Sequence, residues 1–258
     1  IVSDQATGLM WQRHDDGNTY TSSEASDYCG NLRLGGYSDW RVPAIAELTS
    51  IIDYGRYEPV LKPVFTSVVN TPTPTYRSST TYANSTIYAW DVNFGTGKLG
   101  AHEKAGIQRV HCVRGDSETI IVSDDYSDNG DGTASDNMTQ LMWVKVEDTD
   151  GDGDVDSNDE MNWEEALNFC EHLNLAEHED WRLPTPKELQ TLVDYSLYDP
   201  AIDTTVFPNT VSANYWTSTT YAYPVASSYA WYVDFSTGNM SSYSKSNTDY
   251  VRCVRGGQ

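Results

Sequence analysis

An internal repeat constrains this chain most strongly, because two copies of one sequence are expected to build two copies of one fold. The strings that recur in the same order are Gly8–Trp11 with Gln140–Trp143, Asp39–Pro43 with Asp180–Pro184, Ser79–Ala83 with Ser218–Ala222, and Cys112–Gly115 with Cys253–Gly256. The 258 residues suffice for two domains of about 130 residues each. We therefore predict a first domain over 1–115, an acidic linker over 116–135 and a second domain over 136–258.

The second copy carries an insertion near its start. Trp11 and Trp143 are 132 residues apart, whereas Cys29 and Cys170 are 141 apart, which places nine extra residues between these landmarks in the second copy. The aspartate-rich run over 148–159 lies in that interval. We expect the insertion to contribute something that the first copy lacks.

Negative charge is concentrated between the two copies. The chain has 16 basic and 38 acidic residues, a net charge of −22, and residues 116–160 alone hold 15 acidic residues and one basic residue. Nucleic acids and anionic membranes bind basic surfaces, so neither is an expected partner. No apolar run approaches the 18 or so residues of a membrane-spanning helix, so we expect no membrane insertion.

Each copy has two cysteines that are 83 residues apart, Cys29 with Cys112 and Cys170 with Cys253. Neither a Cys-x-x-Cys pair nor a histidine at ligand spacing accompanies them, so zinc is not expected. One disulfide in each copy is the simplest interpretation, and it implies an oxidising compartment, outside the cell or on its surface. Four buried free thiols in a cytosolic protein are the alternative.

Capping boxes and prolines mark two helices in each copy. The predicted helices cover 22–33 and 44–53 in the first copy, and 163–174 and 185–194 in the second. Short segments rich in Tyr, Thr and Val are typical of strands, and they cover 88–94 and 110–114 with their equivalents 229–235 and 251–255. The predicted fold class is α+β, with two helices on a small, mostly antiparallel sheet in each domain. Six tryptophans that recur in both copies are expected in the cores.

A family resemblance follows from the repeated strings. Thr7–Trp11, Tyr37–Pro43, Glu47-Leu48, Ser79–Tyr82 and Cys112–Gly115 in the first copy, with their equivalents in the second, resemble the family named for the C-terminal domain of a bacterial collagen-like adhesin, the Lcl C-terminal family. A helix cysteine bonded to a final-strand cysteine also looks like the C-type lectin-like fold. The resemblance implies two tandem C-type lectin-like domains in a secreted or surface module used for attachment.

The insertion has the spacing of a calcium-binding loop. Oxygen donors stand at loop positions 1, 3, 5, 7, 9 and 12, with a glycine at position 6 where the chain turns sharply. The predicted ligands are Asp148, Asp150, Asp152, Asp154, Asp156 and Asp159. Because the loop leads directly into the predicted helix at 163, calcium is expected to have a structural role there. An acidic loop without metal is the alternative.

The C-terminal part of the second copy is the predicted ligand face. Residues 212–250 include 24 Ser, Thr, Tyr or Asn in 39 positions, and such residues combine amphipathic contact area with adaptable hydrogen bonding. Between matching flanks, 240–250 shares only a lysine with its counterpart 99–109, which indicates a segment free to take different ligands. The predicted contact residues are Trp216, Ser241, Ser242, Tyr243, Ser244, Asn247, Asp249 and Tyr250.

We expect a non-catalytic protein, because the two copies share no histidine and the chain contains no nucleophile elbow, phosphate loop or HExxH motif. The sequence favours an extracellular recognition or adhesion module that binds a glycan or a protein ligand. A structural spacer or filament subunit that self-assembles is the alternative. A relative of the formylglycine-generating enzyme, which shares the fold and uses cysteines, is a third and weaker interpretation, since every cysteine here has a partner at fixed spacing.

Overall fold

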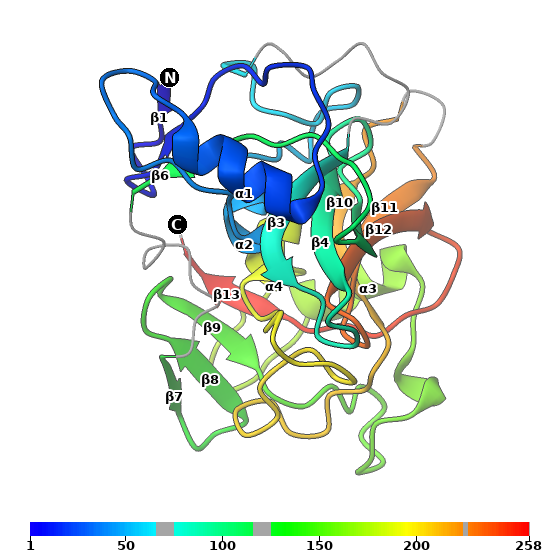
Figure 1. The fold of residues 1–258 in the computed structure, drawn as a ribbon. Helices are drawn as coiled ribbons and strands as arrows, with labels where there is room; N and C mark the ends of the chain where they lie inside the picture. Colours follow the sequence, from blue (N-terminus) through cyan, green and yellow to red (C-terminus); the bar gives the residue numbers. More distant parts are fainter. Residues whose placement is uncertain (66–74, 116–124, 224–226, 258) are drawn as a thin grey trace. The chain divides into compact units, whose positions relative to one another are not determined.

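The computed structural model describes residues 1–65, 75–115, 125–223 and 227–257 (Figure 1). The chain forms two compact units, Ile1–Ile121 and Val122–Gln258. Each unit is α+β, with few helices and small antiparallel sheets, as predicted. Among the described residues, no helix is long and apolar enough to cross a membrane.

The described residues of the first unit form two three-stranded sheets and two α-helices. In chain order its elements are β1 (Val2–Ser3), β2 (Met10–Trp11), α1 (Ser22–Asn31), α2 (Ile45–Ser50), β3 (Thr75–Thr81), β4 (Tyr88–Asn93), β5 (Leu99–Glu103) and β6 (Val113–Arg114). One sheet has the order β1-β2-β6 and the other the order β3-β4-β5. Because β2 pairs with β6, the two ends of the unit close on each other.

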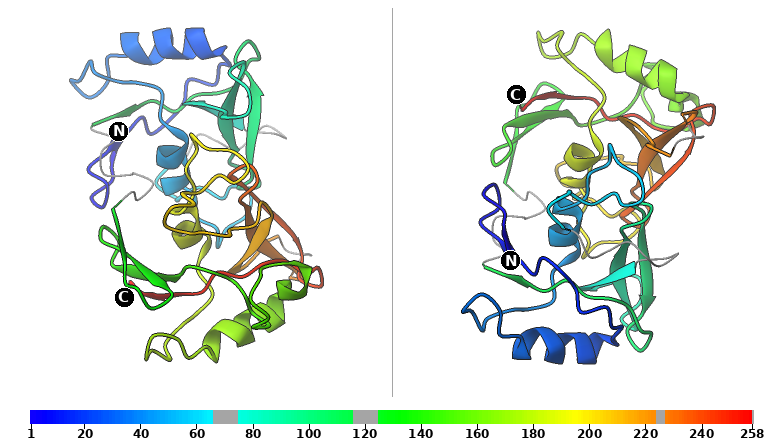
Figure 2. Two further views of the ribbon diagram at one scale, coloured as in Figure 1. Left: turned by 90° about the horizontal axis from the view of Figure 1, so that it is seen from below. Right: turned by 90° about the horizontal axis from the view of Figure 1, so that it is seen from above.

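The second unit repeats this plan with additions. Its elements are β7 (Tyr126–Asp128), β8 (Thr133–Asp136), β9 (Leu141–Val144), the 3-10 helix η2 (Ser157–Asp159), α3 (Trp163–Glu171), α4 (Pro186–Gln190), β10 (Asn214–Thr220), β11 (Tyr229–Asp234), β12 (Asn239–Ser244) and β13 (Val254–Gly256). The sheets have the orders β13-β9-β8-β7 and β10-β11-β12. The helix α3, yellow-green in Figure 2, is the equivalent of the blue helix α1.

The predicted linker over 116–135 extends too far. Its first part, 116–124, lies outside the described residues, but β7 and most of β8 fall within its second part. These strands pair in register with each other and then with β9, so they belong to the sheet of the second unit. The turn-rich string 128–132 is the hairpin connection between them.

The long helices begin where the sequence places them. Thr21 accepts a hydrogen bond from the Glu24 amide and completes a capping box before α1, and Asn162 does the same with Glu165 before α3. The second helices are shorter than predicted, and each ends at a hydroxyl that bonds back into the helix. Thr49 and Thr191 donate to backbone carbonyls three residues earlier, which offers the chain an alternative to a further helical turn.

Both predicted disulfides are present, Cys29–Cys112 and Cys170–Cys253. Each joins the long helix of its unit to the residue just before the last strand, since β6 and β13 begin one residue later than these cysteines. The repeated tryptophans are core residues as expected. All are at most 3% exposed, and they are Trp11, Trp40, Trp90, Trp143, Trp181 and Trp231.

A repeated arginine fixes the second helix in each unit. Arg41 donates two hydrogen bonds to Glu47 of α2 and one to the carbonyl of Gly115. Arg182 makes the same contacts with Glu188 of α4 and with the carbonyl of Gly256. Two-point pairing of a guanidinium with a carboxylate is directional, so it sets the angle of this helix. α2 packs on β3 and β4, and α4 packs on β10 and β11.

Candidate functional site

The acidic insertion gathers three of its six predicted ligands. Carboxylate oxygens of Asp148, Asp150 and Asp152 all lie within 4.8 Å of one another. The loop itself holds Asp148 in place, because this carboxylate accepts hydrogen bonds from the amides of Gly151 at 2.7 Å and Gly153 at 3.0 Å. Three carboxylates gathered in this way offer the oxygen ligands that Ca²⁺ prefers.

The other three predicted ligands are not part of this group. Asp159 is 1% exposed and accepts hydrogen bonds from the amides of Thr149 at 2.5 Å and Asp156 at 2.8 Å. Burial alone would raise the pKa of Asp159, but these hydrogen bonds lower it below its ordinary value. Asp156 caps η2 by accepting from the Asn158 amide at 2.7 Å. Asp156 and Asp159 therefore close the base of the loop, whereas Asp154 is exposed.

Like charges face one another across the loop. The charge of Asp152 raises the pKa of Asp154, with desolvation and Asp156 acting in the same direction. The amide of Asp152 lowers the pKa of Asp150 by hydrogen bonding, yet desolvation and the surrounding carboxylates raise it overall. A divalent cation would relieve this repulsion, so the residues present fit a hard metal ion.

A pocket of about 680 Å³ lies on the first unit. Seven of its ten lining residues belong to the segment 99–109, which is the counterpart of the predicted ligand segment 240–250. The segment comprises β5 and the chain that leads back to β3, where the Arg109 amide bonds to the carbonyl of Thr75. The divergent segment of the first copy thus surrounds a concave site.

A polar triad contributes two residues, His102 and Gln108, to the pocket lining. Asp91 of β4 is 2% exposed, and its Oδ2 contacts Nδ1 of His102 and accepts a hydrogen bond of 2.9 Å from Nε2 of Gln108. Burial raises the pKa of Asp91, against these two hydrogen bonds. The imidazole of His102 remains 60% exposed. Asp91 therefore orients two residues that line the pocket.

Arg77 supports the loop beneath the triad. Its guanidinium donates to Oγ of Ser22 at 2.7 Å and to the carbonyl of Gly106 at 2.6 Å. The side chain is fully buried, and burial lowers the pKa of the guanidinium. β3 pairs Arg77 directly with Asp91, which places both side chains on one face of the sheet.

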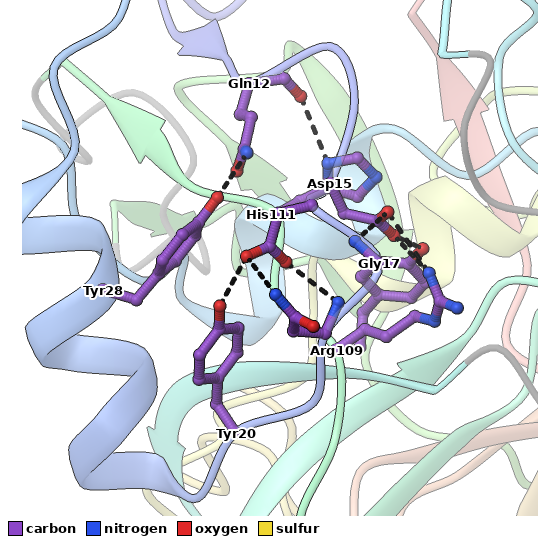
Figure 3. Close-up of polar contacts among 10 residues, drawn as sticks. Gln12, Asp15, Gly17, Tyr20, Tyr28, Arg109 and His111 are labelled. Atoms are coloured by element: carbon purple, nitrogen blue, oxygen red, sulfur yellow. Dashed lines mark hydrogen bonds and ion pairs between the residues drawn. The ribbon is translucent and has the colours of Figure 1, made fainter.

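A second buried network holds Arg109 beside the pocket (Figure 3). Arg109 donates to both carboxylate oxygens of Asp15, at 3.2 and 3.1 Å, and Tyr76 donates its hydroxyl to the same carboxylate. His111 stacks on Tyr76 with the ring centroids 4.9 Å apart. Burial lowers the pKa of His111 to about 4, so this imidazole is neutral at physiological pH.

The second unit places its buried ion pair differently. Glu147 is equivalent to Asp15, but its partner is Arg252, which takes the place of His111. Both side chains are at most 1% exposed, and burial raises the pKa of Glu147 to about 7. Each unit thus keeps an acid at this position, while the cation comes from a different neighbouring residue.

Four of the eight predicted ligand contacts are buried, which corrects the prediction. Trp216 is 0% exposed and donates from Nε1 to the carbonyl of Met161. Its counterpart Arg77 is buried too, so the exchange of arginine for tryptophan did not indicate a surface position. Strand alternation turns Ser242 inward. The others are Asp249 and Tyr250, both less than 9% exposed.

The remaining predicted contacts reach the surface. Tyr243, Ser241 and Ser244 are partly exposed, and Asn247 is exposed. Tyr243 stacks on Trp216 at 5.1 Å and meets Tyr232 edge-on at 4.5 Å between ring centroids. An aromatic cluster therefore covers this face of β10–β12.

The triad of the first unit was missed by sequence reasoning. The signal was present in the repeat, because Asp91, His102 and Gln108 have the unlike counterparts Tyr232, Tyr243 and Asp249. The repeat shows only that these positions differ, however, because nothing in the sequence indicates that the three side chains meet.

Comparison with protein families agrees with the repeat. A family model for the Lcl C-terminal domain matches residues 1–114 and, a second time, residues 132–255. None of the curated proteins matches the chain. The two matches cover most of the sequence and coincide with the repeated halves of the structure. The chain therefore belongs to the Lcl C-terminal domain family, of which it contains two tandem domains.

Proposed function

We propose that this chain is a non-catalytic, extracellular recognition or adhesion module that binds a glycan or a protein ligand. The observation that carries the proposal is the pocket of the first unit, because it is lined chiefly by a segment that differs between the repeats at ten of its eleven positions. The two disulfides support an oxidising location. Membership in the Lcl C-terminal domain family suggests a non-enzymatic extracellular module.

We place the principal ligand site in the first unit, whereas the sequence predicts it in the second. In the second unit Trp216, Tyr232 and Tyr243 pack against one another, whereas the equivalent positions of the first unit carry the polar residues Arg77, Asp91 and His102, of which His102 lines the pocket. The C-type lectin-like fold is part of the same proposal. Its support is the disulfide that joins the long helix to the residue before the last strand, and the pairing of an early strand with the last strand in each unit, β2 with β6 and β9 with β13.

Calcium is proposed as a structural ion of the second unit. Asp148, Asp150 and Asp152 would hold it, and the ion would fix the loop that leads into α3. Calcium is then expected to raise the melting temperature of the second unit and leave that of the first unchanged. A chelator that alters neither transition in calorimetry of the full chain would refute this role.

Ligand binding is tested by presenting the full chain to arrays of glycans and of extracellular proteins. Ile107 lines the pocket and is 66% exposed, so Ile107→Ser removes apolar contact without disturbing the core. Loss of that contact is expected to weaken capture about tenfold. Thr248→Ser at the equivalent position of the second unit is the matched control and should bind as the unchanged chain does. Equal weakening by both variants would contradict the proposal.

The spacer or filament alternative predicts assembly without a ligand. Size-exclusion chromatography over a range of concentrations distinguishes it, because a filament subunit elutes earlier as its concentration rises. A monomer that captures a ligand supports recognition instead.

A further inference from the structure

We infer that the pocket of the first unit accepts the basic side chain, lysine or arginine, of a partner protein. The inference rests on the proposed recognition function and names the chemistry that the pocket selects. It comes from the hydrogen-bonding groups that line the pocket and from its exposed apolar rim.

The pocket offers hydrogen-bond acceptors. Gln108 is 8% exposed, and its Oε1 has no hydrogen-bond partner among the described residues, because its amide group is turned to donate to Asp91. The carboxylate of Glu103, on the same segment, has no side-chain partner in the described parts of the chain either. Oε1 of Gln108 is shielded from solvent, so a ligand reaches it only when this side chain shifts toward the pocket. Because a buried acceptor without a partner is costly, such a shift is favoured when the ligand donates a hydrogen bond.

The cations around the pocket are already engaged. Arg109 is paired with Asp15, Arg77 is directed at Ser22 and two backbone carbonyls, and Lys104 donates to Thr81. Among the described residues that line the pocket, Glu103 is therefore the charged side chain that remains for a ligand, and it favours a positive one. An ammonium or guanidinium group supplies donors in the required number.

The rim suits the stem of such a side chain. Ile107 is the most exposed of the large apolar residues described in the first unit, at 66%, and it adjoins Gln108 in the pocket wall. Lysine and arginine combine an apolar stem with a charged head. The stem would cover Ile107 while the head reaches Gln108 and Glu103.

The second unit lacks these polar residues. Register places Trp216, Tyr232 and Tyr243 on the face that carries Arg77, Asp91 and His102 in the first unit. Their stacked and edge-on rings occupy the space in which Asp91 and His102 meet. The basic side chain is thus a ligand of the first unit alone.

The test uses Nα-acetyl-arginine methylamide as the probe and the citrulline analogue, which has the same shape without the charge, as its control. Each is titrated into the isotope-labelled full chain and followed by amide NMR. The arginine probe is expected to shift the amides of 99–109 and leave those of 240–250 in place, and citrulline should bind at least tenfold more weakly. Equal binding of the two probes, or shifts in both units, overturns the inference.

Two variants and a third probe make the result specific. Glu103→Gln should weaken arginine binding about fivefold to tenfold, whereas Glu171→Gln, an exposed acid on α3, should not change it. A neutral saccharide that shifts the amides of 99–109 while arginine does not would overturn the basic-ligand inference and leave the proposed recognition function standing. If neither probe shifts these amides, the inference fails, and the array experiment decides the proposed function separately.

Discussion

Asp249 is a buried carboxylate whose removal should stabilise the second unit. The side chain is 6% exposed, and its Oδ2 has no hydrogen-bond partner among the described residues. Desolvation raises the pKa of Asp249 from 3.8 to about 8, and Glu160 acts in the same direction against a hydrogen bond from Asn214. The first unit has an amide, Gln108, at this position. We predict that Asp249→Asn increases the free energy of unfolding at alkaline pH.

The sign and size follow from proton linkage. An acid whose pKa is raised by folding favours the folded state while protonated, so stability falls as pH rises from about 4 to about 8. A rise in the pKa of Asp249 from 3.8 to about 8 corresponds to at most about 5–6 kcal/mol. Relaxation and water entry reduce the cost of a buried charge, so we expect a gain of about 2–4 kcal/mol above pH 8. Below pH 4 both side chains are neutral and the gain should vanish.

Urea unfolding of the full chain, followed by amide NMR at several pH values, measures this directly, because peaks from each unit report on that unit alone. Asp180→Asn is the control. Arg255 hydrogen-bonds to Asp180 and lowers its pKa, so that variant should lose stability rather than gain it. The reasoning is refuted if Asp249→Asn leaves the pH dependence of the second unit unchanged, or if it destabilises that unit at pH 8.

Three further predictions concern a disulfide, the repeated arginine–glutamate pair and the acidic loop. Replacing Cys29 and Cys112 by alanine opens a loop of 83 residues. In the chain-entropy model this should lower the free energy of unfolding by about 4–5 kcal/mol, as measured by urea unfolding against the intact chain. A loss of stability below about 1 kcal/mol would count against that model. Glu47→Gln should destabilise the first unit by about 2–3 kcal/mol. Glu188→Gln should destabilise the second unit less, because the Glu188 side chain is 20% exposed and that of Glu47 only 1%. The opposite order in thermal unfolding would contradict this. Asp152→Asn should abolish the calcium-dependent rise in melting temperature without changing the chelated protein, and calorimetry showing an unaltered calcium response would exclude Asp152 as a ligand.

The sequence predicts the helix starts well, because the signals that set them involve only neighbouring residues. Capping boxes act over three residues, so Thr21 and Asn162 marked the helix starts correctly. Helix ends were less predictable, because hydroxyls such as that of Thr49 end a helix only when the side chain turns back onto it. The predicted linker extends too far along the chain. The strands β7 and β8 gain their stability by pairing with each other and with β9, and the polarity of the sequence does not indicate that pairing.

The sequence by itself determined that there are two domains, which cysteines belong together and where the acidic loop lies, because repetition and spacing are properties of the chain alone. Only the tertiary structure decided which residues share a site. Asp91, His102 and Gln108 come from two strands and a loop, and Trp216 is buried in the core of the second unit with Tyr243 stacked on it. Burial and partnership arise from the packing of distant segments, and this packing made the pocket a feature of the first unit.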